Sequence, residues 1–129
     1  MVNAIPRGSS PIADMQDYMA VEDIPGYVHI LVGWHSRCKL DGPASEKLLA
    51  FVRNSIRDLP RPDVILDVSN VTYINSQAIG IIAVRITRAV RERGGEVHLM
   101  HPDPWVRQLI TTLKLDAVLP ILERLPEFV

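Results

Sequence analysis

Some segments of this chain have the apolar pattern of β-strands and others have the period of about 3.6 residues of α-helices, and this alternation predicts the secondary structure. A short strand at 18–21 and a run rich in β-branched and aromatic residues at 27–32 flank the turn-forming pair Pro25-Gly26, which predicts an opening hairpin. The nearly continuous apolar run at 63–68 is typical of a strand buried on both faces, as in a parallel sheet. Another short run at 96–100 predicts a further strand.

Three segments show the helical period. The first is introduced by Pro43, whose φ is preset for a first turn, and is stopped by Pro60. The second covers about 76–93 and ends at a glycine pair, and the third has Asp103 as its N-cap and Pro104 as its first residue. In each of the first two segments the apolar residues share one face: Leu48, Val52, Ile56 and Leu59; Ile79, Ile82, Ile86 and Val90. The apolar residues of the third segment are Trp105, Val106, Leu109, Ile110 and Leu113.

Together these segments give the order β-β-α-β-α-β-α, with a brief extended piece at 71–74 and a final short strand at 118–122. Strands that alternate with helices imply a largely parallel sheet joined by right-handed crossovers. We therefore predict an α/β fold with a mixed, mostly parallel sheet of about four to five strands packed with helices. This domain is expected to span residues 18–129, after a flexible tail at 1–17 in which prolines, a glycine and serines break any period.

Composition narrows the class of protein. The chain has 129 residues, which fits one domain, and its formal net charge of -1 argues against binding to nucleic acid or to anionic lipid. A single cysteine, Cys38, allows no internal disulfide, and the first residues lack the pattern of a signal peptide. The most apolar stretch, 78–84, is too short to span a membrane, which takes about 20 residues. We expect a soluble cytoplasmic protein without membrane insertion.

From Asp41 onward, the succession of segments resembles the STAS family, the sulfate transporter and anti-sigma factor antagonist domains. Leu40-Asp41 opens the first helix as the family's Leu-Asp does, and residues 64–74 (VILDVSNVTYI) are similar to the family's strand and following turn. The family then usually reads Asp-Ser-Ser-Gly-Leu-Gly, where this chain has NSQAIG at 75–80. A helix ending in two glycines, a strand and a last helix follow, so the resemblance covers roughly residues 20–123.

The resemblance implies a binding module without enzymatic activity and without a cofactor. In the antagonist branch of the family, the serine after the aspartate is phosphorylated by a partner anti-sigma factor that is also a kinase. The unphosphorylated antagonist binds that partner and frees the sigma factor. By position that serine is Ser76, so we expect an anti-sigma factor antagonist that binds an anti-sigma factor/serine kinase and regulates transcription. Asn75, Gln77 and Ile79 are expected at the adjoining partner-binding surface.

The residues around Ser76 allow two interpretations. Ser76 stands where a buried strand ends and a helix begins, where free N–H groups and the helix dipole favour a phosphate. Serine and asparagine are also preferred N-caps, so Asn75 and Ser76 can simply cap the helix. Asn75 replaces the family's aspartate, Gln77 replaces a hydroxyl residue, and Lys114 stands where the family has a helix-ending glycine. A switched antagonist and a constitutive binder therefore both stay open.

Arg85, Arg88 and Arg91 are expected on the outer side of the second helix. They form either a solvated face or a docking surface for an acidic partner, since the guanidinium fork pairs with carboxylates. We include Arg85 and Arg88 in the predicted partner-binding surface.

Other chemistries have weaker signals. His35 with Cys38, and His98 with His101, are three residues apart, as zinc ligands can be, but nothing in the sequence brings the two pairs together. Cys38 lacks a recognisable nucleophile motif, and there is no glycine-rich phosphate loop. We expect no metal site. Two alternatives to the antagonist stay open: a scaffold or adaptor subunit, as in a stressosome-like assembly or beside a transporter ATPase, and a small-ligand carrier. A homodimer is also possible.

Overall fold

A computed structural model gives the fold of residues 18–21 and 29–123, and the predicted tail at 1–17 lies outside the described residues. The strands are β1 (Tyr18–Val21), β2 (His29–Trp34), β3 (Cys38–Leu40), β4 (Asp63–Asp67), β5 (Val71–Ile74), β6 (Val97–Met100) and β7 (Ile121–Leu122). The helices are α1 (Gly42–Ile56), α2 (Ser76–Gly80), the π-helical segment η2 (Ile81–Ile86), α3 (Thr87–Arg91) and α4 (Pro104–Thr112). The predicted order is confirmed, with β3 added, because three residues are too few to show a period.

Five strands form one sheet in the order β1-β2-β4-β6-β7. β1 pairs with β2 in the antiparallel sense, with Tyr18 opposite Trp34, which confirms the opening hairpin. The other neighbours in this sheet are parallel, so the predicted mixed, mostly parallel α/β sheet is confirmed. β3 and β5 form a separate parallel pair at one end of the molecule.

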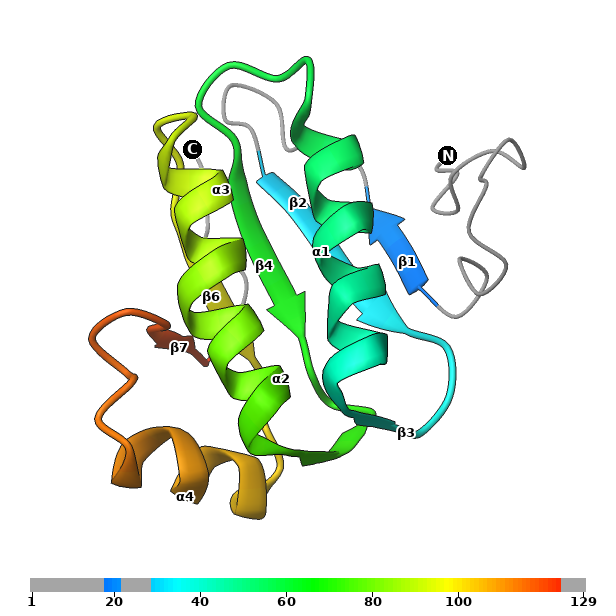
Figure 1. The fold of residues 1–129 in the computed structure, drawn as a ribbon, viewed down its shortest axis with the longest axis vertical. Coiled ribbons are helices and arrows are strands. Elements are labelled where there is room, and N and C mark those ends of the chain that lie inside the picture. The colour runs from blue at the N-terminus through cyan, green and yellow to red at the C-terminus, as the bar shows by residue number, and fades with distance from the viewer. Residues whose placement is uncertain (1–17, 22–28, 124–129) are drawn as a thin grey trace.

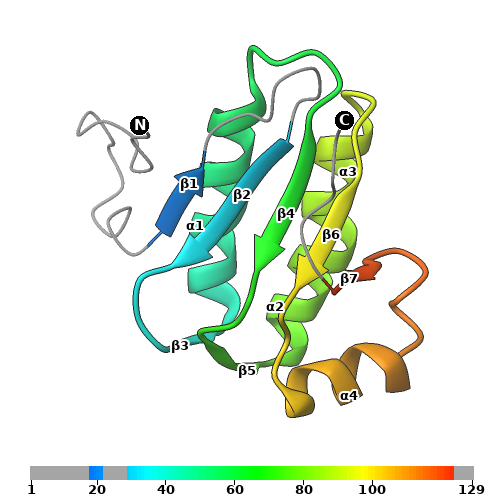
Figure 2. The ribbon, with the colours of Figure 1, turned by 180° about the vertical axis from the view of Figure 1, so that it is seen from behind.

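The two long helical segments, α1 and α2–η2–α3, lie side by side on one face of the sheet, and α4 lies at its lower end (Figure 1). Seen from behind, the strands stand in front of those helices (Figure 2). Val64, Ile65 and Leu66 are each 0% exposed, which confirms the prediction that β4 is buried on both faces. The main core fills the space between the sheet and the helices, and its largest fully buried side chains include Phe51, Leu48 and Ile86.

The chain is helical without a gap from Ser76 to Arg91, which agrees with the helix predicted over about 76–93, but this helix is not α-helical throughout. Its middle part, η2, is π-helical, with a wider turn than the α-helix on either side. Thr87, which is 4% exposed, donates its hydroxyl to the Ala83 carbonyl at 2.7 Å and so gives a carbonyl of this segment a partner. The sequence pattern missed the π segment because its apolar residues still fall at helical spacings.

The helices α3 and α4 each end at a residue with left-handed backbone conformation, which is Gly94 after α3 and Lys114 after α4. Gly94 has φ +86°, and its N–H donates to the Arg91 carbonyl at 2.9 Å. Lys114 has φ +58°, and its N–H donates to the Thr111 carbonyl at 3.0 Å. Glycine adopts this conformation without steric penalty and lysine does not. The sequence departure at Lys114 therefore falls on a position whose backbone favours glycine.

Replacing Lys114 with glycine is expected to raise the free energy of unfolding by about 1 kcal/mol, because the left-handed strain disappears while the unfolded chain gains some freedom. Urea unfolding followed by circular dichroism measures it. Lys114→Ala, which keeps a Cβ, is the matched control and should leave stability unchanged. An unchanged midpoint for Lys114→Gly would mean that the lysine is not strained.

Candidate functional site

The short strands β3 and β5 lie side by side, and each leads directly into a helix (Figure 2). Asp41 caps α1, with its Oδ1 accepting the Ala44 N–H at 2.9 Å. Asn75 caps α2 in the same way, with its Oδ1 accepting the Ala78 N–H at 2.9 Å. The Asn75 N–H donates to the Leu40 carbonyl at 3.1 Å and so joins the two turns. The positive ends of two helices therefore lie at the same end of the molecule.

Ser76 is the first residue of α2, and its side chain is exposed. Because Asn75 supplies the capping oxygen, the Ser76 hydroxyl is not required as a cap. Within the part of the chain that the structure describes, that hydroxyl makes no hydrogen bond. Of the two residues that the sequence offered as caps, only Asn75 acts as one.

Gln77 and Ile79 extend this end of the molecule in different ways. A Cβ on Gly42 would collide with the side-chain amide of Gln77, so this amide lies directly against the start of α1. Gln77 is nevertheless exposed, whereas Ile79 is half-buried and packs against the hydrophobic core. The exposed surface at the start of α2 therefore consists of Ser76 and Gln77, with Asn75 and Ile79 partly beneath it.

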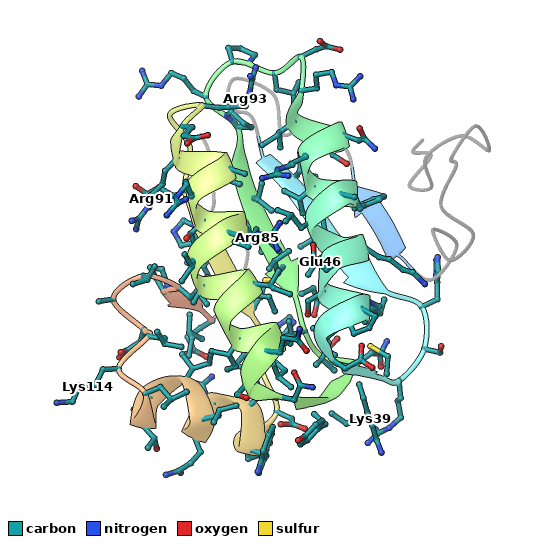
Figure 3. All side chains as sticks on the ribbon, in the orientation of Figure 1. Lys39, Glu46, Arg85, Arg91, Arg93 and Lys114 are labelled. Atoms are coloured by element: carbon teal, nitrogen blue, oxygen red, sulfur yellow. The ribbon has the colours of Figure 1, made fainter. Side chains whose placement is uncertain are left out.

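Arg85 and Arg88 lie farther along the same helical stretch. The Arg85 Nη1 donates to Oε2 of Glu46 on α1 at 2.6 Å, and Figure 3 shows both residues between the two long helices. Arg88 is exposed and has no ionic partner among the described residues. Arg85 follows Ser76 by nine residues, which places it about two helical turns farther along. The structure thus does not gather the arginines at Ser76, and the charge of Arg85 is already paired.

An aromatic pair near Ser76 was missed by the sequence analysis. Tyr73 on β5 stacks on Trp105 of α4, with ring centroids 5.2 Å apart and an interplanar angle of 23°. Both are exposed, at 44% and 45%, so Trp105, although it is one of the apolar residues of its helix, lies outside the core. Two features of the sequence could have indicated the exposure of these rings: Tyr73 alternates with the buried residues of its strand, and Trp105 directly follows Pro104 in the first turn of α4. Trp34, in contrast, is 6% exposed and belongs to the core.

Cys38 and the histidines do not form a common cluster. Cys38 is half-buried in β3, and a cleft of about 350 Å³ beside it is lined by Trp34, Ser36, Arg37, Cys38, Lys39, Leu40, Asp41, Pro43, Ala44 and Lys47. His98 lies on β6, and the Nδ1 of His101 is 3.7 Å from Oδ1 of Asp67. Residues 18–21 and 29–123 contain no group of three or more His, Cys, Asp or Glu side chains placed to hold a metal ion.

The sequence and the fold together define the family of this protein. The STAS domain model matches residues 34–127, and the chain belongs to the STAS domain family. No curated protein matches the chain by sequence comparison. No helix within the described residues combines the length and the apolar composition needed to cross a membrane.

Solved structures of anti-sigma factor antagonists have the same fold. One from Thermotoga maritima, described as such an antagonist, is 21% identical with a TM-score of 0.62, over 74% of this chain and 80% of that one. An antagonist from Mycobacterium paratuberculosis is 21% identical with a TM-score of 0.61, over 90% and 91% of the two chains. The phosphorylated Bacillus cell fate determinant SpoIIAA is 15% identical with a TM-score of 0.58, over 83% and 92%. At these identities the likeness shows the fold.

Proposed function

We propose that this chain is an anti-sigma factor antagonist: it binds an anti-sigma factor/serine kinase in the cytoplasm, and phosphorylation of Ser76 releases that partner. The observation that carries the proposal is that Asn75 and Ser76 have different roles at the start of α2. Asn75 caps the helix, and Ser76 presents an exposed hydroxyl with no hydrogen bond among the described residues. The fold shared with anti-sigma factor antagonists, one of them solved in its phosphorylated form, supports the same function.

The start of α2 suits a phosphate in the free protein. Helix N-termini carry unpaired N–H groups and partial positive charge, which stabilise an anion there by about 0.3–1 kcal/mol. The N-terminus of α1 lies at the same end, since Asn75 is bonded to Leu40 directly before it. Phosphorylation at Ser76 should therefore leave the fold intact.

A phosphate at a protein–protein interface has the opposite effect. It adds roughly -1.5 to -2 charges, and burying such a charge without a partner costs several kcal/mol. This penalty exceeds the gain at the helix end, so the modified protein should dissociate from its partner. The switch thus needs no rearrangement of the fold, only an exposed serine inside the contact surface.

The direct test is to isolate the protein from its native host and fragment the peptide that contains Ser69, Thr72 and Ser76. Phosphate on Ser76 under at least one growth condition is the expected result. Phosphate on Ser69 or Thr72 would contradict the assignment. Its complete absence under several conditions would favour a constitutive binder or a scaffold subunit.

Asn75→Asp provides a second arm of this test. Aspartate also serves as an N-cap and restores the carboxylate that the family pattern has beside the phosphoacceptor. If the kinase uses that carboxylate, phosphorylation of Ser76 in vitro should be faster for Asn75→Asp than for the natural sequence. Asn75→Asp combined with Ser76→Ala is the control and should take up no phosphate.

A further inference from the structure

Four large apolar side chains are strongly exposed within the described residues: Tyr73, Val84, Trp105 and Leu113. Of these four, Tyr73 and Trp105 form a stacked pair and come from different elements. An exposed aromatic pair of this kind is not explained by packing, because about half of each side chain still faces water.

A lysine extends the pair into a strip across three elements. Lys39 on β3 is the register partner of Tyr73 on β5, so the two side chains leave the sheet on the same face. Tyr73 in turn stacks on Trp105 of α4. Figure 3 shows Lys39 pointing away from the body of the molecule at its lower end. We call Lys39, Tyr73 and Trp105 the aromatic strip. It lies beside the start of α2, because Ser76 follows Tyr73 by three residues.

The chemistry of the strip suits a protein partner. Tryptophan and tyrosine are the residue types most enriched among interface residues that dominate binding. Their mutual stacking holds both rings in place before binding, which reduces the conformational entropy lost on association. Lys39 has no ionic partner among the described residues, so a cation is available at one end of an apolar surface. The complementary partner surface carries a carboxylate next to an apolar side chain.

We propose that the aromatic strip is a second contact for the anti-sigma factor kinase, which docks an acidic, apolar segment on it while its active site addresses Ser76. This inference rests on the proposed function. It adds an anchor whose residues phosphorylation does not change, while the charge at Ser76 still releases the partner as a whole. Trp105 supplies most of the buried area, and Lys39 selects a carboxylate.

Tryptophan fluorescence reports on the strip directly. The kinase-type anti-sigma factors encoded in the source genome would be purified and titrated one by one into the full chain and into Trp105→Phe. The chain has two tryptophans, and Trp105→Phe keeps only the buried Trp34. The emission change of the natural chain minus that of Trp105→Phe therefore reports on Trp105. A blue shift and protection from acrylamide quenching at Trp105 on binding are expected. Calorimetric binding without any change at Trp105 would overturn the strip while leaving the proposed function in place.

Affinity measurements with matched variants complete the test. Trp105→Ala should weaken binding roughly thirtyfold, whereas Leu113→Ala, an equally exposed apolar residue at the far end of the same helix, should stay within about twofold. Lys39→Glu should slow association, most strongly at low salt. Equal effects of Trp105→Ala and Leu113→Ala would overturn the proposal. So would a blue shift of the protein alone on concentration, which would assign the strip to a second copy. No binding to any kinase would overturn both proposals.

Discussion

Ser76→Asp is expected to weaken binding to the anti-sigma factor kinase by about 100-fold or more. The aspartate places a permanent negative charge where the free protein exposes a neutral hydroxyl, and the interface must bury it. An unpaired buried charge costs several kcal/mol, and each 1.4 kcal/mol is about tenfold in affinity. Isothermal titration calorimetry with the purified kinase measures the loss.

The matched control is Ser76→Ala, which cannot be phosphorylated and adds no charge. It should bind like the natural protein and should continue to bind after incubation with ATP. Thermal melting should show that Ser76→Asp is at least as stable as the natural chain, because a carboxylate in the first turn is favoured by the helix dipole. Equal affinity for Ser76→Asp and Ser76→Ala would contradict the proposed switch.

Gly95→Ala is expected to lower the free energy of unfolding by about 3 kcal/mol. Gly95 is buried between the end of the α3 turn and the start of β6. A Cβ there would overlap the carbonyl group of Pro62 and would lie 3.1 Å from Cγ1 of Val90. Backbone atoms cannot rotate away as a side chain can, so the start of β4 or of β6 must move, and overpacking of this kind costs about 1–3 kcal/mol or more. Denaturant unfolding measures it.

Gly80→Ala is the matched control for the same change in composition. Gly80 lies inside the helical stretch, and a Cβ there would meet nothing within 4 Å. Alanine is the better helix former by about 1 kcal/mol, so this variant should be more stable than the natural protein. Opposite signs at Gly95 and Gly80 are the expected result. Destabilisation at both positions would mean that the loss at Gly95 is not specific to the close approach of the Pro62 carbonyl group.

The fold could be predicted from the sequence because its signals are local and repeated. The apolar run of β4, the caps Asp41 and Asp103, and the glycine pair after α3 each specify their element without reference to the rest of the chain. The π-helical segment and β3 could not be predicted. A wider turn leaves the apolar spacing unchanged, and a three-residue strand has no period.

The candidate site was predicted only in part. The sequence located Ser76 at a strand-to-helix boundary but left open whether Ser76 or Asn75 was the cap, since both residue types can fill that role. It placed Arg85 among the partner-binding residues, which stays a prediction, and it could not show that Glu46 of another helix lies 2.6 Å away.

The sequence by itself determined the order of the elements, the α/β class, the family resemblance and the position of the candidate phosphoacceptor, because each depends on neighbours within a few residues. Only the structure decided that Asn75, and not Ser76, caps α2, and that Arg85 forms an ion pair with Glu46. Only the structure showed that Tyr73 and Trp105 meet in an exposed strip beside Ser76. The Asn75 cap is local and stayed open only because serine and asparagine both serve as caps, but the Arg85–Glu46 and Tyr73–Trp105 contacts join segments far apart in the chain. Their existence depends on how β5, α4 and the two long helices pack, which no local pattern of residues records.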